Sequence, residues 1–273
     1  MLDFKRKNLK MSFRKKLANN TFLRSFFMPI LRMLNFEFCW KHDVTNRKFY
    51  LLSYLHKGYW YYGLKREERE LERFRQFVKE GNTVLEIGGH IGYLTQIFED
   101  FVGKSGQVVV VEPTEFSRRF LSKNTRSDTI ILPIAISNKV GNFEFYTEKF
   151  GGFTNSLVAE FTENSNKVLS QSLITKKANV TKIQVETSTL DIVCKDYDIS
   201  PHFIKIDVEG AELDVLKGAS YTLRNVKALM VEISRNHIAV YKLLSTFDFV
   251  AYDQNLDRIA NKFPSGNIFF IKH

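Results

Sequence analysis

The chain has 273 residues, of which 44% are hydrophobic and 26% are charged, with 14 glycines and 5 prolines. This composition is typical of one large folded domain with an appendage, and it excludes a disordered polyelectrolyte, a collagen-like repeat and a disulfide-stapled miniprotein. Forty Lys and Arg residues against thirty Asp and Glu residues give a net charge of +10. Such a surplus raises the question of an anionic partner, either nucleic acid or a membrane.

The surplus of positive charge lies at the N-terminus. Residues 1–32 contain nine basic residues and one acid, so this arm carries +8 and the other 241 residues carry only +2. The arm also has apolar residues at helical spacing, interrupted by Pro29: Phe22, Leu23, Phe26, Phe27, Ile30, Leu31 and Leu34. A basic amphipathic segment can bind a membrane surface, or it can dock its apolar side on the protein itself. The near-neutral remainder argues against nucleic acid as a partner.

Neither the cysteines nor the hydropathy pattern indicates a secreted, metal-binding or membrane-spanning protein. Cys39 and Cys194 match no zinc or C-x-x-C spacing, and no window approaches eighteen uninterrupted apolar residues. A signal peptide also fits poorly. We expect a cytoplasmic protein without a bound metal, with peripheral contact at the inner membrane surface if the arm binds lipid.

The predicted elements fall into two regions, 1–62 and 63–273. The first is a basic extension that ends in aromatic residues between 49 and 62, which are expected to pack in a core. The second begins with a charged helix over 64–80.

Strand and helix patterns then alternate along the second region. Strands are predicted at 83–87, 107–111, 129–137, 203–208, 228–234, 247–252 and 267–271. Helices are predicted at 93–102, 116–124, 211–223 and 237–244. This alternation predicts an α/β fold of Rossmann-like type, with a parallel sheet covered by helices on both faces.

An insertion interrupts the alternation at about residues 143–187. Its two ends, 143–147 and 183–187, alternate like exposed edge strands. The Gly-, Asn-, Ser- and Lys-rich stretch between them predicts a loop that acts as a lid or contacts the substrate.

A glycine-rich turn, EIGGHIG over residues 86–92, follows the first strand of the alternation. Gly88 and Gly92 allow the backbone to turn tightly, but the spacing is not G-x-G-x-x-G. Glu86 would repel a pyrophosphate and suits an ammonium group, such as that of S-adenosylmethionine. Glu112 ends the next strand and can accept hydrogen bonds from both ribose hydroxyls, as an acid in NAD-binding folds also does. Together the two acids favour S-adenosylmethionine, although either could be a solvated acid at a strand end.

A second cluster of charged residues lies on the strand predicted at 203–208. Alternation places Lys205, Asp207 and Glu209 on one side of this strand. Burying these charges is costly unless they pair or meet a ligand, and the end of the strand is where open α/β folds bind ligands. Asp207 and Glu209 are therefore candidate site residues, with a structural cluster around Lys205 as the alternative.

The run FIKIDVEGAELDVLKGA over 203–219 resembles the signature of the FkbM family of methyltransferases. The K-x-D-x-E-G-x-E core of that signature is intact from Lys205 to Glu212. Supporting matches occur at 83–92, 112–113, 135–137 and 189–191, so the resemblance covers roughly residues 71–271. The turn departs from the usual family form, because Glu86 replaces Asp and the pair Gly89-His90 replaces Ala-Asn.

The resemblance implies a class I methyltransferase that uses S-adenosylmethionine and usually acts on a hydroxyl oxygen. It implies a seven-stranded sheet whose last strand is antiparallel, and acceptors such as sugars, glycans or natural products. The implied cofactor-binding residues lie along the carboxyl edge of the sheet: Glu86, Gly88, His90, Gly92, Glu112, Ser137 and Asp207.

Methyl transfer by in-line displacement requires alignment of the acceptor oxygen and removal of its proton, and it requires no metal. Asp207 is the first candidate for this role, Glu209 the second and His237 the third. A nucleic-acid methyltransferase and a nicotinamide-dependent oxidoreductase are the alternatives. The first lacks an Asn/Asp-Pro-Pro-Tyr/Phe motif, and the second is disfavoured by the glycine spacing.

Overall fold

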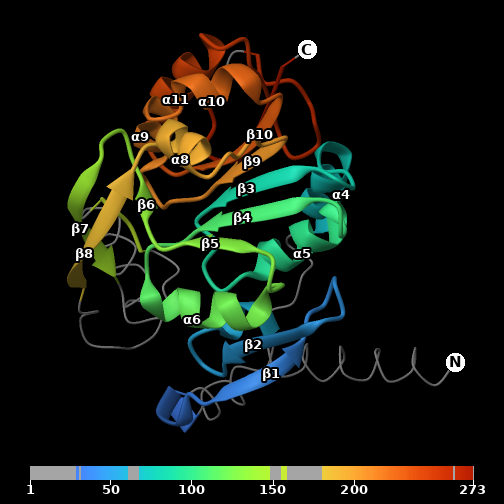
Figure 1. The fold of residues 1–273 in the computed structure, drawn as a ribbon, viewed down its shortest axis with the longest axis vertical. Helices are drawn as coiled ribbons and strands as arrows, with labels where there is room; N and C mark the ends of the chain where they lie inside the picture. Colours follow the sequence, from blue (N-terminus) through green and yellow to red (C-terminus); the bar gives the residue numbers. More distant parts are fainter. Residues whose placement is uncertain are drawn as a thin grey trace, which may run out of the picture. The chain divides into compact units, whose positions relative to one another are not determined.

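A computed structural model describes residues 29–30, 32–60, 68–147, 155–158, 180–260 and 262–272 (Figure 1). The chain divides into two compact units, 1–68 and 69–273, whereas the sequence analysis divided it after residue 62. Most of the basic arm and the centre of the insertion lie outside the described residues, so the predictions made for them stay predictions.

The described part of the first unit is built on a β-hairpin. Strands β1 (Glu37–Lys41) and β2 (Lys48–Leu52) pair antiparallel and are followed by a short helix, α3 (Lys57–Trp60). The aromatic packing predicted for this region is confirmed for Phe49 and Tyr54, which are both buried. The hairpin was not predicted, because the aromatic run by itself does not indicate the strand with which it pairs.

The second unit contains the predicted sheet of seven strands. These are β3 (Thr83–Ile87), β4 (Gln107–Val111), β5 (Ile130–Leu132), β9 (Phe203–Ile206), β10 (Ala228–Ile233), β11 (Val250–Tyr252) and β12 (Gly266–Ile271). Their order is β11-β12-β10-β9-β3-β4-β5, and β12 alone is antiparallel to its neighbours. The α/β fold class and the antiparallel last strand are confirmed.

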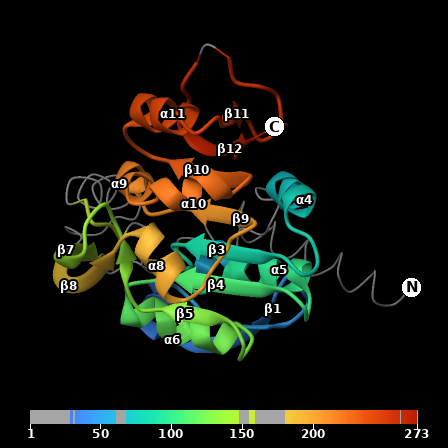
Figure 2. The ribbon, with the colours of Figure 1, turned by 45° about the horizontal axis from the view of Figure 1, so that its top comes forward.

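Helices cover both faces of this sheet (Figure 2). They are α4 (Glu68–Phe77), α5 (Tyr93–Val102), α6 (Glu115–Asn124), α8 (Leu190–Asp196), α9 (Glu212–Lys217), α10 (Ser220–Asn225) and α11 (His237–Ser245). Helices α8 to α11 pack on the face formed by alternate strand residues such as Leu85, Ile204 and Val231. On the other face, Phe74 of α4 contacts Phe98 of α5 and Phe203 of β9, with ring centroids 5.1 and 5.8 Å away. None of the helices within the described ranges is long and apolar enough to cross a membrane.

Two predicted elements are each divided in two. The strand predicted at 129–137 breaks at Pro133, which has no N–H for a strand ladder, and its second part, β6 (Ala135–Ile136), joins another sheet. The helix predicted at 211–223 breaks after α9. Gly218 there approaches the backbone so closely that a Cβ atom would lie 2.3 Å from the Ser137 carbonyl oxygen.

The insertion contributes the second sheet, with the order β6-β8-β7. Strands β7 (Gly141–Thr147) and β8 (Thr181–Ser188) pair antiparallel, which confirms both predicted strands. The edge position is confirmed for β7 and was wrong for β8, which lies between β6 and β7. A further piece of the insertion, residues 155–158, is held against β7 by paired backbone hydrogen bonds between Tyr146 and Ser156 of 2.8 and 3.0 Å.

The turn between β3 and α5 lies directly against the end of β9. Gly88 has a φ of +88°, and a Cβ atom built on it would lie only 1.8 Å from the Asp207 carbonyl oxygen. The Asp207 N–H in turn donates to the Ile87 carbonyl at 3.0 Å. Because Gly88 has no side chain, the turn can lie against Asp207, the first residue of the loop between β9 and α9. This loop, residues 207–211, is part of the family signature and is called the signature loop.

Substitution of Gly88 by Ala is expected to destabilise the fold more than the same change at Gly266. Both glycines have a positive φ, but a Cβ atom at Gly266 would meet nothing within 4 Å. Gly266→Ala should therefore cost only backbone strain, about 1–2 kcal/mol. Gly88→Ala adds a clash with backbone that costs about a further 1–3 kcal/mol. Urea unfolding measures both, and equal losses would contradict the close approach described here.

Candidate active site

The register of the central strands places two polar rows on the face covered by α4 and α5. Lys205 of β9 is aligned with Glu86 of β3. One step further, Asp207 follows the end of β9, beside Gly88 on one side and Glu232 of β10 on the other, since Val231 pairs with Ile206. Both rows run across neighbouring strands and lie near the carboxyl ends of these strands, where α/β sheets bind ligands.

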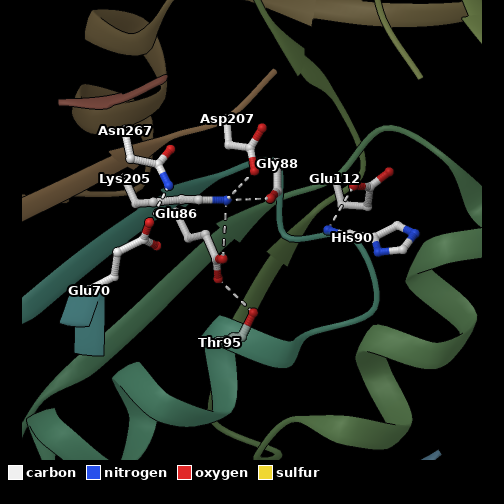
Figure 3. Close-up of polar contacts among 9 residues, drawn as sticks. All are labelled: Glu70, Glu86, Gly88, His90, Thr95, Glu112, Lys205, Asp207 and Asn267. Carbon is white, nitrogen blue, oxygen red and sulfur yellow. Dashed lines mark hydrogen bonds and ion pairs between the residues drawn. The ribbon is translucent and has the colours of Figure 1, made fainter. Parts of the chain in front are cut away.

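Lys205 is the centre of these rows (Figure 3). Its side chain is buried, and its ammonium donates to the Gly88 carbonyl oxygen and to Asp207 Oδ2, both at 3.1 Å. It also lies 3.8 Å from Glu86 Oε1, while Thr95 Oγ1 donates to Glu86 Oε2 at 2.6 Å. Burial by itself lowers the pKa of Lys205, but Asp207 and Glu86 outweigh this and raise it, so Lys205 stays charged.

Glu86 is therefore held inside the protein. It is 1% exposed, and burial raises the pKa of its carboxyl against the opposing effects of Lys205 and Thr95. Asp207, by contrast, keeps 27% of its side chain exposed. Of these two acids, Asp207 is the more exposed, and both interact with the same ammonium.

The signature loop after β9 is bent and well anchored. Glu209 has a φ of +53°, and its carbonyl oxygen accepts a hydrogen bond from Ser156 Oγ at 2.7 Å. Glu212 Oε1 accepts from the Gly210 N–H at 2.6 Å. Burial, with Asp207 and Glu232 nearby, raises the pKa of Glu209 well above its usual range, and burial raises that of Glu212 to about 7. The insertion thus contacts the loop that carries Glu209.

Glu112, at the end of β4, is organised by backbone groups. Its Oε2 accepts from the His90 N–H at 3.0 Å, and its Oε1 accepts from the Thr114 N–H at 2.9 Å and the Thr114 hydroxyl at 2.6 Å. Burial raises the pKa of this carboxyl, and the Thr114 and His90 hydrogen bonds oppose that rise. Oε2 retains one lone pair that can accept a ribose hydroxyl.

The unusual residues of the turn are compatible with this geometry. His90 has a φ of +47°, a conformation in which Asn and His are both enriched, and it contacts Glu112 through its backbone N–H. At Gly89, where the family usually has Ala, a Cβ atom would lie 2.1 Å from Val110 Cγ1. Val110 therefore fills the space that an alanine methyl group would need.

Lys205 and the residues that its ammonium contacts, Glu86, Gly88 and Asp207, are called the Lys205 group. Two predicted site residues, Ser137 and His237, lie apart from this group. The Ser137 N–H donates to the Ser188 carbonyl oxygen at 2.9 Å, where β6 meets β8. His237 is exposed at the first position of α11, and within the described ranges it has no hydrogen bond or ion pair with Asp207 or Glu209. The structure brings together Glu86, Gly88, Lys205 and Asp207, with His90 and Glu112 alongside, and leaves the assigned roles as predictions.

The sequence analysis missed four residues that the structure adds to this region: Glu70, Thr95, Ser156 and Glu232. Glu232 could have been found, because it is the single acid in the apolar strand ALMVEI and stands one strand away from Asp207. The other three reach the region from α4, from α5 and from the insertion, and a sequence pattern gives no register for such contacts.

The model of the methyltransferase FkbM domain matches residues 86–258, which span more than half of the chain. The matched range includes the signature, Glu86 and Glu112. The chain belongs to the FkbM methyltransferase family. It is thus an S-adenosylmethionine-dependent methyltransferase, and the matched residues include the whole Lys205 group. The family match sets aside the nicotinamide oxidoreductase, and a search of curated proteins found no match.

Solved methyltransferases resemble the FkbM chain at low identity. An S-adenosylmethionine-dependent O-methyltransferase from Thermotoga maritima is 12% identical, with 75% of this chain and 65% of that one covered and a TM-score of 0.43. Aeropyrum pernix fibrillarin with natively bound S-adenosylmethionine is 14% identical over 86% and 81%, with a TM-score of 0.39. A precorrin-6y C5,15-methyltransferase from Geobacter metallireducens is 9% identical over 77% and 89%, also with a TM-score of 0.39. No conclusion about the acceptor is drawn from likenesses this weak.

The charges of the site fit S-adenosylmethionine. Four carboxyl groups interact with the single ammonium of Lys205: Glu86, Asp207, Glu209 and Glu232. Such an excess of buried acid suits a ligand that carries a positive sulfur and an ammonium group. Within the described ranges, no group of three or more His, Cys, Asp or Glu side chains could hold a metal ion.

Substitution of Lys205 by Met is expected to destabilise the protein strongly, because it leaves Asp207 and Glu86 without their buried counter-charge. Loss of one partner of a buried pair costs about 3–5 kcal/mol. Lys182→Met is the matched control, since Lys182 pairs with Glu144 at 3.0 Å on the surface. An exposed pair contributes little to stability, because solvent screens its charges. Chemical unfolding of both variants tests this, and a loss at Lys205 no larger than at Lys182 would contradict the role given to Lys205.

Proposed function

We propose that this methyltransferase transfers the methyl group to a hydroxyl oxygen of a sugar, a glycan or a natural-product-like acceptor. The observation that carries the proposal is the Asp207 carboxylate, which is held by Lys205 at the carboxyl edge of the sheet and remains partly exposed. Bound S-adenosylmethionine supplies a methyl group on a positively charged sulfur that is already activated for displacement. The protein then has to align the acceptor oxygen and take up its proton.

Asp207 is the group proposed to accept that proton. Its Oδ2 accepts a hydrogen bond from the Lys205 ammonium, which fixes the carboxylate, and the exposed part of the carboxylate is proposed to meet the acceptor hydroxyl. The Lys205 side chain also donates to the Gly88 carbonyl, so the turn proposed to bind the donor and the proposed base are held by one cation. Glu112 is proposed to bind the ribose through Oε2, and Glu209 is the second candidate for contact with the acceptor.

Asp207→Asn is expected to lower kcat by about 10²- to 10⁴-fold, the usual contribution of a general base. Donor binding should change less, because the amide keeps the size of the side chain. The matched control is Asp214→Asn, since Asp214 lies in α9 and pairs with Lys217 and Asn138 on the surface. Full kcat in Asp207→Asn with the true acceptor would eliminate Asp207 as the proton acceptor.

The acceptor class is tested by labelled methyl transfer. S-adenosylmethionine with a ¹³C methyl group is incubated with the enzyme and a glycan and lipid extract, and the products are analysed by NMR and mass spectrometry. The proposal expects an O-methyl ether on a carbohydrate or natural-product hydroxyl. Label found only in RNA, or only on nitrogen or carbon, would overturn it.

The basic arm is proposed to bring the enzyme to an anionic membrane surface, because residues 1–32 carry +8 of the net +10. Each Lys or Arg near such a surface contributes about 1 kcal/mol to binding. Combined reversal at Arg14, Lys15 and Lys16 to Glu should therefore reduce binding to vesicles of anionic lipid at least 100-fold. Vesicle sedimentation measures this, with vesicles of neutral lipid as the control. Equal binding to both kinds of vesicle, or no effect of the reversal, would contradict the proposal.

A further inference from the structure

The sheet register places two carboxyl groups side by side at the edge of the site. Glu232 of β10 stands next to Asp207, one position beyond the parallel pair formed by Val231 and Ile206. The Asp207 charge is the largest cause of the raised pKa of Glu232. Two neighbouring carboxyl groups do not both ionise easily, so the pair holds a proton.

We propose that the Asp207–Glu232 pair stores one proton in the donor-free enzyme, releases it when the cationic donor binds, and regains a proton from the acceptor during methyl transfer. Glu232 is thereby a positioning residue that acts through Asp207. The first two steps concern the donor alone, and the last step rests on the proposed O-methyl transfer.

Glu232 is the member of the pair that carries the proton. The Lys205 ammonium donates directly to Asp207 Oδ2 at 3.1 Å, so Glu232 is the carboxyl of the pair without that hydrogen bond. Among the described residues, the ammonium donates to Gly88 and Asp207 but not to Glu232, and a charge on Glu232 would face the charge on Asp207. Two carboxyl groups in contact cannot both ionise easily, so the one farther from the ammonium keeps the proton.

The surroundings of Glu232 strengthen this assignment. Asp207 and Lys205 face it from β9, and Glu70 faces it from α4; Asn267 is its register partner on β12. Glu209 lies close enough to interact with both acids of the pair. Asp207 and burial raise the pKa of Glu232 to about 8, against the opposing effect of Lys205. Glu232 is thus protonated at neutral pH and ionised well above pH 8.

A positive charge brought to this edge of the sheet favours the ionised form of Glu232, because the pair then has a second counter-charge besides Lys205. The proton leaves for solvent when the donor binds. In the transfer step, the O–H bond of the acceptor breaks as the O–C bond forms, and the electron pair of the S–C bond stays on sulfur. The proton passes to Asp207 and is shared with Glu232 as the positive charge on sulfur disappears, so the net charge of the site is unchanged.

Proton release on binding is measured by titration calorimetry of the full chain in buffers of different ionisation enthalpy. S-adenosylmethionine and S-adenosylhomocysteine are compared, because the two share every ionisable group and differ only in the methylated, charged sulfur. At about pH 7, binding of the charged donor should release up to about one more proton than binding of the neutral product. This difference should vanish near about pH 10, where the pair is already ionised.

Glu232→Gln should remove more than about half of that difference, because the amide cannot lose a proton. The control is Glu186→Gln, an exposed acid of β8, which should leave it unchanged. Equal release with the two wild-type complexes would overturn the proposal, as would loss of the difference in Glu209→Gln but not in Glu232→Gln. If Glu232→Gln does not fold, the wild-type comparison from pH 6 to 10 still decides. A different acceptor would leave these results unchanged, so failure of the proposed function is distinguished from failure of this inference.

Discussion

The buried ammonium of Lys205 is the interaction on which the site depends. It joins the Gly88 carbonyl of the turn after β3 to the carboxylate that follows β9, and it offsets the charge of Glu86. A buried lysine is tolerated here because Asp207 and Glu86 stabilise its charged form. Position in the sheet separates the two acids, because Glu86 lies within β3 and Asp207 follows the end of β9. Glu86 pairs inside the fold with Thr95, and Asp207 faces outward.

Much of the fold was predictable because its information is local. The glycine turn, the Val-rich strand before Glu112 and the signature strand each have an unambiguous pattern over a few residues. The alternation of strands and helices along the chain then predicted the α/β class. The errors occurred where long-range contacts decide local structure. Gly218, where the predicted helix breaks, lies against the Ser137 carbonyl, and residues 135–136 pair with a strand some fifty residues later. Neither neighbour is visible in the segment itself.

The site was predictable to a similar degree. Asp207 and Glu112 could be chosen because strand ends meet at one edge of a parallel sheet, and Lys205 stood out as a charge on a buried strand. Glu86 shows the limit of that reasoning: its predicted role toward the donor's ammonium stays a prediction, and the sequence did not indicate that this acid also contacts Lys205 and the Thr95 hydroxyl. Glu232 shows another limit, because a single acid in an apolar strand gains meaning only from the register that places it beside Asp207.

A crystal structure with bound S-adenosylmethionine would show whether the Lys205 ammonium holds Asp207 beside the reacting methyl group. We expect a ribose hydroxyl on Glu112 Oε2 and the sulfur at the carboxyl edge of β3 and β9, with the methyl group directed toward Asp207. A donor bound with its methyl group directed away from Asp207, or a Lys205 ammonium that leaves Asp207 for the ligand, would contradict it.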